Sequence, residues 1–207
     1  ATSRNPRPVT TSAARLSSTT FDLADHPLGA ASLVDIAAGD GLLFATPDHG
    51  LAAWGVTATT TVIAAHDTLA GTDGVAIGAI GFRPADDQLT IPEVTVRSDS
   101  EGHRSLIVVR AHNDPRGLPT TIDEAIDGRG IANAPNPATN GYRIRAMVDT
   151  EKYLAAVTAA RDAVRAGDID KAVIARPVEI STDEPIDVHA VLRRLETTFA
   201  NTYRFSA

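Results

Sequence analysis

The chain has 207 residues, 43% of them hydrophobic, which is enough to bury the core of one domain or a large part of a bigger one. Its 26 acidic and 19 basic residues give a net charge of −7, and no block of Lys or Arg supplies the basic surface that a nucleic acid needs. No apolar run approaches the roughly 20 residues that span a bilayer, and the absence of cysteine excludes disulfides, thiolate metal sites and thiol nucleophiles. We therefore expect no nucleic-acid partner and no membrane insertion, with the cytoplasm as the default compartment.

The first half of the sequence has the character of a β-rich region. Residues 1–20 are polar, rich in Ser and Thr and without period, so residues 1–40 are expected to hold a loose arm and one first element. A hairpin is predicted where the turn residues 47–50 separate two apolar runs. The β-like runs are 41–45, 51–63, 74–82, 88–97 and 104–112, with turns at 83–87 and 98–102, and together they predict an antiparallel meander.

The second half alternates helices with strands. Residues 113–141 contain four prolines and predict a long connection, with at most a helical turn at 121–126. A strand is expected at 142–148, and a helix follows because apolar residues recur on one stripe between a capping Asp149 or Thr150 and Gly167. The stripe consists of Tyr153, Val157, Ala160 and Val164.

The last elements are a strand at 171–180, a helix at 187–201 and a strand at 202–207, with Tyr203 and Phe205 on one face. The sequence stops within this last strand, without a turn or cap, so we expect a fragment of a longer protein. Antiparallel strands followed by helix–strand units predict the α+β class.

Several familiar sites find little support in the residues. The glycines of 74–82 match no phosphate-binding fingerprint and precede no helix, so they are interpreted as strand glycines. No G-x-S-x-G sequence is present, which argues against a serine hydrolase. The histidines have neither i, i+4 helical spacing nor neighbouring carboxylates at ligand spacing, so no zinc site is expected; they are His26, His49, His66, His103, His112 and His189.

Lys171 is the candidate functional residue. It begins the apolar run "KAVIARPVEI", in which Val173 and Ala175 share its face of an extended strand, and a run that is apolar on both faces suggests a covered strand. The simpler interpretation is a solvated lysine whose stem lies along the protein. The alternative is a partly desolvated lysine whose neutral amine accepts a proton near neutral pH.

At this lysine the sequence resembles the chorismate-utilising enzymes, which include the isochorismate, salicylate, anthranilate and aminodeoxychorismate synthases. "DIDKAVIARPVEI" after a helix ending in "AVRAG" is similar to the start of the family's catalytic half, and "NTYRFSA" is similar to the strand before its next motif. "GAIGFRPADDQLTIPE" resembles the F-x-P…IPE stretch of isochorismate synthases of the siderophore type. The resemblance covers most of residues 40–207. It implies an α/β sandwich of large, mainly antiparallel sheets, incomplete in this chain, with residues 41–207 forming the N-terminal part of a single chorismate-binding domain.

The resemblance also implies a reaction. Relatives that add water to chorismate carry a lysine at the position of Lys171, which implies the role of general base toward the water that attacks C2 while the C4 hydroxyl leaves. A carboxylic acid and Mg²⁺ complete the family's chemistry, but the motifs that hold them lie downstream of residue 207. Glu179, Glu184 and Glu196 do not match those motifs, and Arg176 belongs to the lysine motif but is assigned an ion-pair or packing role.

The sequence thus leads to the hypothesis of an isochorismate synthase that isomerises chorismate with Mg²⁺ for siderophore or menaquinone synthesis. Salicylate synthase is the alternative within the family, although the F-x-P…IPE stretch favours the isochorismate branch. A non-catalytic binding or assembly module that retains half of the fold is the alternative outside it. The oligomeric state is left open.

Overall fold

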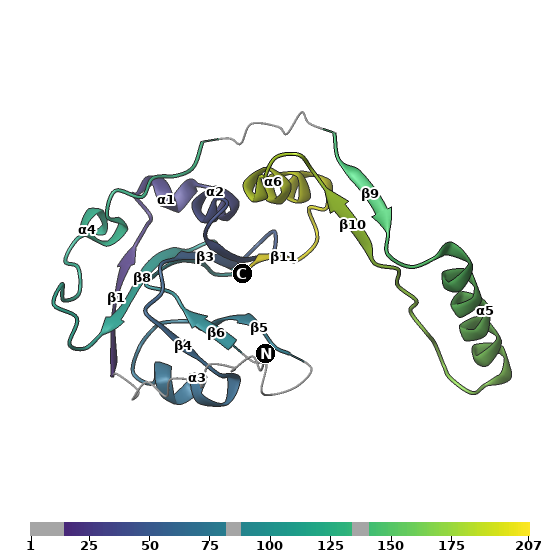
Figure 1. The fold of residues 1–207 in the computed structure, drawn as a ribbon. Coiled ribbons are helices and arrows are strands. Elements are labelled where there is room, and N and C mark those ends of the chain that lie inside the picture. The colour runs from purple at the N-terminus through teal and green to yellow at the C-terminus, as the bar shows by residue number, and fades with distance from the viewer. Residues whose placement is uncertain (1–14, 82–87, 134–140) are drawn as a thin grey trace, which may run out of the picture. The chain divides into compact units, whose positions relative to one another are not determined.

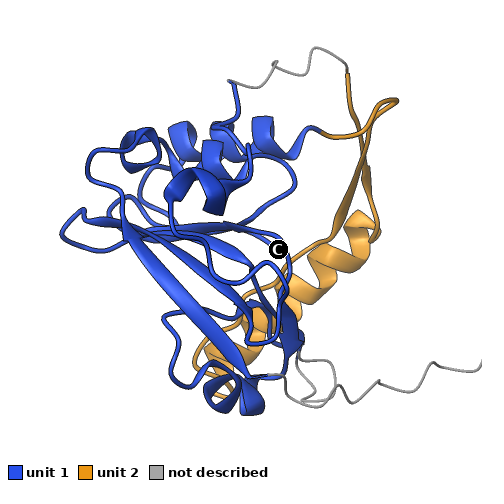
Figure 2. Cartoon of the chain, turned by 90° about the vertical axis from the view of Figure 1, so that its left-hand side faces the viewer, with its two compact units in different colours: residues 1–136, 187–207 blue, residues 137–186 orange. Residues whose placement is uncertain are grey.

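The computed structural model describes residues 15–81, 88–133 and 141–207 (Figure 1). The chain divides into two compact units, coloured separately in Figure 2. Unit 1 comprises residues 1–136 and 187–207, and unit 2 comprises residues 137–186. The expected turn at 83–87 and the first 14 residues of the expected arm lie outside the described residues, as does part of the expected connection, 134–140.

Unit 1 is built on a six-stranded antiparallel sheet in the order β1-β8-β7-β3-β2-β11. The predicted hairpin is confirmed, since β2 and β3 pair directly, with Ala45 opposite Gly50. A Cβ at Gly50 would lie 2.5 Å from the carbonyl oxygen of Phe44, so this turn requires glycine. The strands are β1 (Leu16–Asp22), β2 (Leu42–Ala45), β3 (Gly50–Trp54), β7 (Val94–Ser98), β8 (Arg104–Ala111) and β11 (Arg204–Ser206).

Four helices cover one face of this sheet (Figure 1). The register places Leu43, Ala52, Val96 and Leu106 side by side across four strands, and all four are completely buried. Leu28, Val34, Ala125 and Leu192 bring one buried side chain from each helix to the same core. The helices are α1 (Pro27–Ala30), α2 (Leu33–Ala37), α4 (Ile122–Ile126) and α6 (Val188–Thr198).

The opposite face of the sheet is only partly covered. A second core of Leu16, Ile91, Ile107 and Val109 joins β1 and β8 to a three-stranded sheet in the order β4-β6-β5. The elements on this side are β4 (Ala58–Thr60), α3 (Val62–Leu69), β5 (Ile77–Ala79) and β6 (Gln88–Ile91). The outer side of β2, β3 and β11, at the other end of the sheet, carries exposed aromatic side chains described below.

Unit 2 contains β9 (Arg143–Ala146), α5 (Thr150–Ala166) and β10 (Val178–Ser181), with β9 and β10 paired antiparallel. The predicted helix has the expected caps. The Asp149 side chain accepts a hydrogen bond from the Glu151 amide at 2.9 Å, and Gly167 ends the helix with a left-handed φ of 81°. None of the described side chains of this unit is buried.

Three expectations about the elements were wrong in part. Residues 16–20 are not a loose arm but belong to β1, which pairs along its whole length with β8. The run 51–63 does not end as a strand, because Thr61 caps α3, whose first residue is Val62. The predicted strand 171–180 is formed only from Val178 onward, since β9 offers partners only to residues 178–181.

The remaining pattern agrees with the prediction. The class is mixed α and β with a large antiparallel sheet, and the helical turn expected near 121–126 is α4. The meander is interrupted in chain order, because β4, β5 and β6 of the three-stranded sheet come between β3 and β7, although β3 and β7 pair directly. Within the described ranges, none of the helices combines the length and apolar character that crossing a bilayer requires.

Candidate functional site

Lys171 lies in unit 2, between the end of α5 and the start of β10. The helix is ended sharply at Gly167, whose amide donates to the carbonyl oxygens of Ala163 and Val164. The chain then runs without regular structure from Asp168 to Pro177. Because Gly167 ends α5, Lys171 lies outside the helix, in the irregular segment that follows it.

The surroundings of Lys171 differ from the expected covered strand. Lys171 is exposed, and Val173 on the same stretch is 88% exposed. Pro177 has no amide hydrogen, so it cannot continue the donor ladder of β10 toward the lysine. In the described ranges the Lys171 ammonium makes no hydrogen bond or ion pair, which leaves it available to a ligand.

Arg176 was expected to have an internal ion-pair or packing role; its side chain is exposed but contacts α5. Its guanidinium carbon lies 5.5 Å from the centre of the Tyr153 ring, a cation–π distance. Its Nη1 also donates to the Thr150 hydroxyl at 3.2 Å. Both partners belong to the first turn of α5, so Arg176 ties the irregular segment to that helix.

The three glutamates that sequence reasoning left without a role are placed in different settings. Glu179 on β10 forms an exposed ion pair with Arg145 on β9. Glu184 is exposed and its backbone carbonyl accepts from the Thr182 hydroxyl. Glu196 on α6 accepts from Ser32 at 2.9 Å and pairs with Arg193 at 3.0 Å. None of these contacts joins a glutamate to Lys171.

In the part of the chain that the structure describes, no group of three or more His, Asp or Glu side chains could hold a metal ion. The described residues therefore do not fit a Mg²⁺ site, which needs near-octahedral oxygen coordination. We assign no chemical step to a metal held by them.

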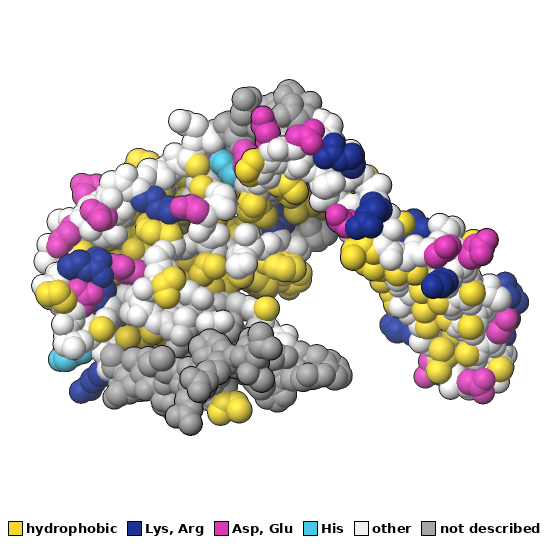
Figure 3. Space-filling view, in the orientation of Figure 1, with side chains coloured by type: hydrophobic (Ala, Val, Ile, Leu, Met, Phe, Trp, Pro, Cys, Tyr) yellow, Lys and Arg dark blue, Asp and Glu magenta, His cyan; other side chains and the backbone are white. Residues whose placement is uncertain are grey.

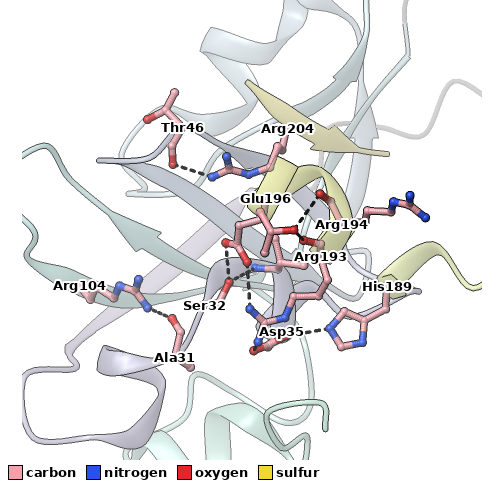
Figure 4. A network of polar contacts seen from close by, with 12 residues as sticks. Ala31, Ser32, Asp35, Thr46, Arg104, His189, Arg193, Arg194, Glu196 and Arg204 are labelled. Carbon is pink, nitrogen blue, oxygen red and sulfur yellow. Dashed lines mark hydrogen bonds and ion pairs between the residues drawn. The ribbon is translucent and has the colours of Figure 1, made fainter. Parts of the chain in front are cut away.

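A buried polar network in unit 1 was not found from the sequence (Figure 4). Asp35 on α2 accepts from His189 Nε2 at 2.9 Å and also pairs with Arg193, both on α6. The side chains of Asp35 and His189 are about nine-tenths buried, whereas Arg193 is 35% exposed. The network joins two helices rather than lining a cavity with a nucleophile, so its geometry supports a structural role.

An apolar groove lies on the partly covered face of the unit 1 sheet. Its volume is about 720 Å³, and its lining includes Phe44, Leu51, Val62, Leu69 and Ile80. Hydrophobic side chains are visible on this side of the unit in Figure 3.

The last strand borders this apolar face. Tyr203 and Phe205 are 64% and 72% exposed, and the Tyr203 ring lies 5.6 Å from the Phe44 ring. Arg204 between them is buried, so the predicted alternation is present with its apolar side outward. Nothing in the described groove resembles a set of acid–base groups.

A family model described as chorismate binding enzyme matches residues 52–207, which include Lys171. A comparison with curated proteins gave no match.

Solved structures show the same fold. MenF, the menaquinone-specific isochorismate synthase from Escherichia coli, is similar over 87% of this chain and 45% of its own, with a TM-score of 0.59 and 19% identity. DhbC from Bacillus anthracis, described as a 2,3-dihydroxybenzoate-specific isochorismate synthase, is similar over 84% of this chain and 41% of its own, with a TM-score of 0.51 and 19% identity. The chain thus spans less than half the length of these two proteins.

Proposed function

The chain belongs to the family of chorismate-binding enzymes, and from this premise we propose that it forms part of an isochorismate synthase in which Lys171 is the general base. The observation that carries the proposal is the position of Lys171 at the head of "KAVIARPVEI", inside the matched residues and directly after the capped end of α5. The fold likeness to two proteins described as isochorismate synthases supports it.

The local structure suits a residue that meets a ligand. The ammonium group of Lys171 has no partner within the described residues, so it is not engaged in a structural ion pair. The side chain of Arg176, by contrast, is held against α5 by Tyr153 and Thr150. Of the two cations in the motif, Arg176 therefore holds the irregular segment against α5, whereas Lys171 has no described partner and can contact a ligand.

In the proposed reaction chorismate is isomerised with water both consumed and released. The neutral amine of Lys171 takes a proton from a water molecule whose oxygen bonds to C2 of the ring. The ring double bonds shift, the bond between C4 and its hydroxyl oxygen breaks, and that oxygen leaves as water after protonation by a general acid. The atoms balance, and no oxidant or reductant is needed.

The acid and the Mg²⁺ ligands are proposed to come from residues beyond 207. When bound, Mg²⁺ would supply charge neutralisation at the substrate carboxylate. The described residues supply no such site, so the proposal for this chain concerns proton transfer at the Lys171 amine alone. Menaquinone and siderophore synthesis are both compatible with the proposal, and of the two structural relatives MenF is described as menaquinone-specific.

The test replaces Lys171 by Ala and by Gln in the complete natural protein. We expect kcat/KM for isochorismate formation to fall by about 10²- to 10⁴-fold in both variants, because neither a methyl group nor an amide accepts a proton near pH 7. Chorismate binding by calorimetry should change little, because the base rather than a wall of the site is removed. Turnover like that of the wild type in Lys171→Ala would overturn the assignment.

The sequence offers a matched control. Lys152, on α5, is the only other lysine of the sequence and is exposed, so Lys152→Ala removes the same charge and should leave turnover unchanged. Product analysis separates the alternatives. Release of salicylate and pyruvate would identify a salicylate synthase, and chorismate binding without any turnover by the wild type would identify a non-catalytic module.

A further inference from the structure

Two arginines of unit 1 are withdrawn from solvent without a carboxylate partner. Arg204, at the start of β11, is 6% exposed, and Arg104, at the start of β8, is half-buried. Among the described residues neither Arg204 nor Arg104 forms an ion pair. Arg110 and Arg193, which are also buried or partly buried in unit 1, each pair with a carboxylate. Removing a cation from water is costly unless hydrogen bonds or an opposite charge compensate.

Backbone carbonyls compensate Arg204 only in part. Its Nη1 donates to the carbonyl oxygens of Ala200, at 3.2 Å, and Thr202, at 3.5 Å. Its Nη2 donates to the carbonyl oxygen of Thr46 at 3.2 Å, as Figure 4 shows. Its Nε is buried and has no hydrogen-bond partner in the described structure. A buried donor without an acceptor is uncommon in folded proteins and calls for an explanation.

Arg104 is in a comparable state. Its Nη1 donates to the carbonyl oxygens of Leu28, at 3.1 Å, and Ala31, which are the hydrogen bonds found for this side chain. Burial lowers the pKa of the Arg104 guanidinium from its ordinary value, because withdrawal from water disfavours the charged form.

Both arginines line the same small pocket of about 120 Å³, beside Ser32, Thr46, His49 and Ser98. A cavity of this volume is large enough for a phosphate or a small carboxylate.

The acidic groups of the pocket do not neutralise the two arginines. Glu196 also lines the pocket, but its carboxylate is already shared between Ser32 and Arg193. Asp48 lies in the exposed turn between β2 and β3, where solvent screens its charge.

We propose that this pocket is a binding site for a small oxyanion held by Arg104 and Arg204. A planar guanidinium is well suited to carboxylate and phosphate oxygens, and a charge-assisted hydrogen bond is strongest where solvent is excluded. The anion would supply the negative charge that the surrounding carbonyls lack. The site is formed entirely within unit 1 and does not depend on the role of Lys171.

The test is a calorimetric titration of the complete protein with inorganic phosphate and, separately, with acetate, at constant ionic strength. We expect saturable binding of one anion per chain and a Tm that rises with anion concentration, as linkage requires for a ligand of the folded state. Binding of phosphate alone or of acetate alone would identify the class of oxyanion. Absence of saturable binding of either anion by the wild type would overturn the proposal.

Matched variants locate the site. Arg104→Gln and Arg204→Gln should each weaken binding at least ~10-fold, because each removes a charge-assisted donor. Arg97→Gln removes the same charge from an exposed position on β7 and should retain the affinity of the wild type. Ser98→Val keeps both arginines but narrows the pocket, so it tests the site even if Arg204→Gln does not fold. Equal weakening by Arg97→Gln would show non-specific attraction and would also overturn the proposal.

Discussion

Units 1 and 2 contain equally regular elements but differ in what those elements bury. In unit 1, α6 places Leu192, which is 4% exposed, in the main core beside α2 and the sheet, although Val191 and Leu195 on the same helix are 44% and 37% exposed. In unit 2, α5 has two good caps and an apolar stripe, yet Val157 and Val164 on that stripe are 37% and 38% exposed, and the neighbouring Leu154 is 55% exposed. The difference teaches that caps and periodicity determine where a helix forms, whereas burial depends on a partner surface.

The same contrast applies to charges. The Asp35–His189–Arg193 network of unit 1 is largely withdrawn from solvent. The pair Arg145–Glu179 of unit 2 is exposed at both side chains, by 73% and 45%. The contribution of an ion pair to the free energy of unfolding depends on how far its charges are desolvated. Breaking the buried network and breaking the exposed pair should therefore change the stability by very different amounts.

The largest expected effect compares one leucine from each unit. Leu106→Ala, in the fully buried core of unit 1, should reduce the free energy of unfolding by about 2–5 kcal/mol, because it removes buried methyl groups and leaves a cavity. Leu154→Ala, at an exposed position of α5, should change the free energy of unfolding by no more than about 0.5 kcal/mol.

Urea unfolding measures both variants with two probes. Fluorescence of Trp54, the only tryptophan, reports unit 1, where its side chain lies against the main core. The circular dichroism signal of the helices reports both units, because it includes the contribution of α5 in unit 2. If Leu154→Ala were as destabilising as Leu106→Ala by either probe, the apolar face of α5 would be covered in solution, and the contrast between the units would fail.

A smaller effect is expected from the ion pairs. Asp35→Asn should destabilise unit 1 by about 3 kcal/mol, the lower end of the range for a broken buried pair, because Arg193 keeps partial access to solvent. Glu179→Gln should cost less than about 1 kcal/mol, as is usual for exposed pairs. Thermal unfolding of the two variants beside the wild type gives the comparison, and equal losses would show that burial does not distinguish the pairs.

The elements of the chain could be predicted where their signals are local. Asp149 and Gly167 bracket α5 within 19 residues of sequence, and the turn at 47–50 joins strands that pair directly. β1 was missed because it is rich in Ser and Thr and its partner β8 lies far along the chain. Distant pairing can turn a polar segment into a strand, and local propensity does not reveal this.

The buried network was not predictable for a similar reason. Asp35 and His189 are separated by 154 positions, so no spacing pattern relates them, and α6 returns to unit 1 only after the whole of unit 2. The opposite error occurred at residues 171–177. Their apolar run suggested a strand, but these residues do not form one, since no strand in the described ranges pairs with them. Lys171 itself was singled out by family resemblance, and its catalytic role remains a prediction.

The smallest effect concerns a charge that unit 1 fixes at its surface. Arg116 lowers the pKa of the Asp114 carboxyl to about 2, mainly through its side-chain hydrogen bonds and next through its backbone amide. Because the folded-state pKa lies below the ordinary value of 3.8, the ionised carboxylate stabilises the fold above about pH 4, and this contribution is lost as the pH falls toward about 2.

Asp114→Asn should therefore have a lower Tm than the wild type near neutral pH, and the two Tm values should converge as the pH approaches about 2. Carboxyl NMR titration gives the direct measurement, with Arg116→Gln as the matched variant. Because this substitution removes the guanidinium but keeps the backbone amide of residue 116, the Asp114 midpoint should move only part of the way back toward 3.8. An unchanged midpoint would mean that the backbone turn rather than the ion pair holds the charge, and that even this loop of unit 1 resembles the weak surface pairs of unit 2.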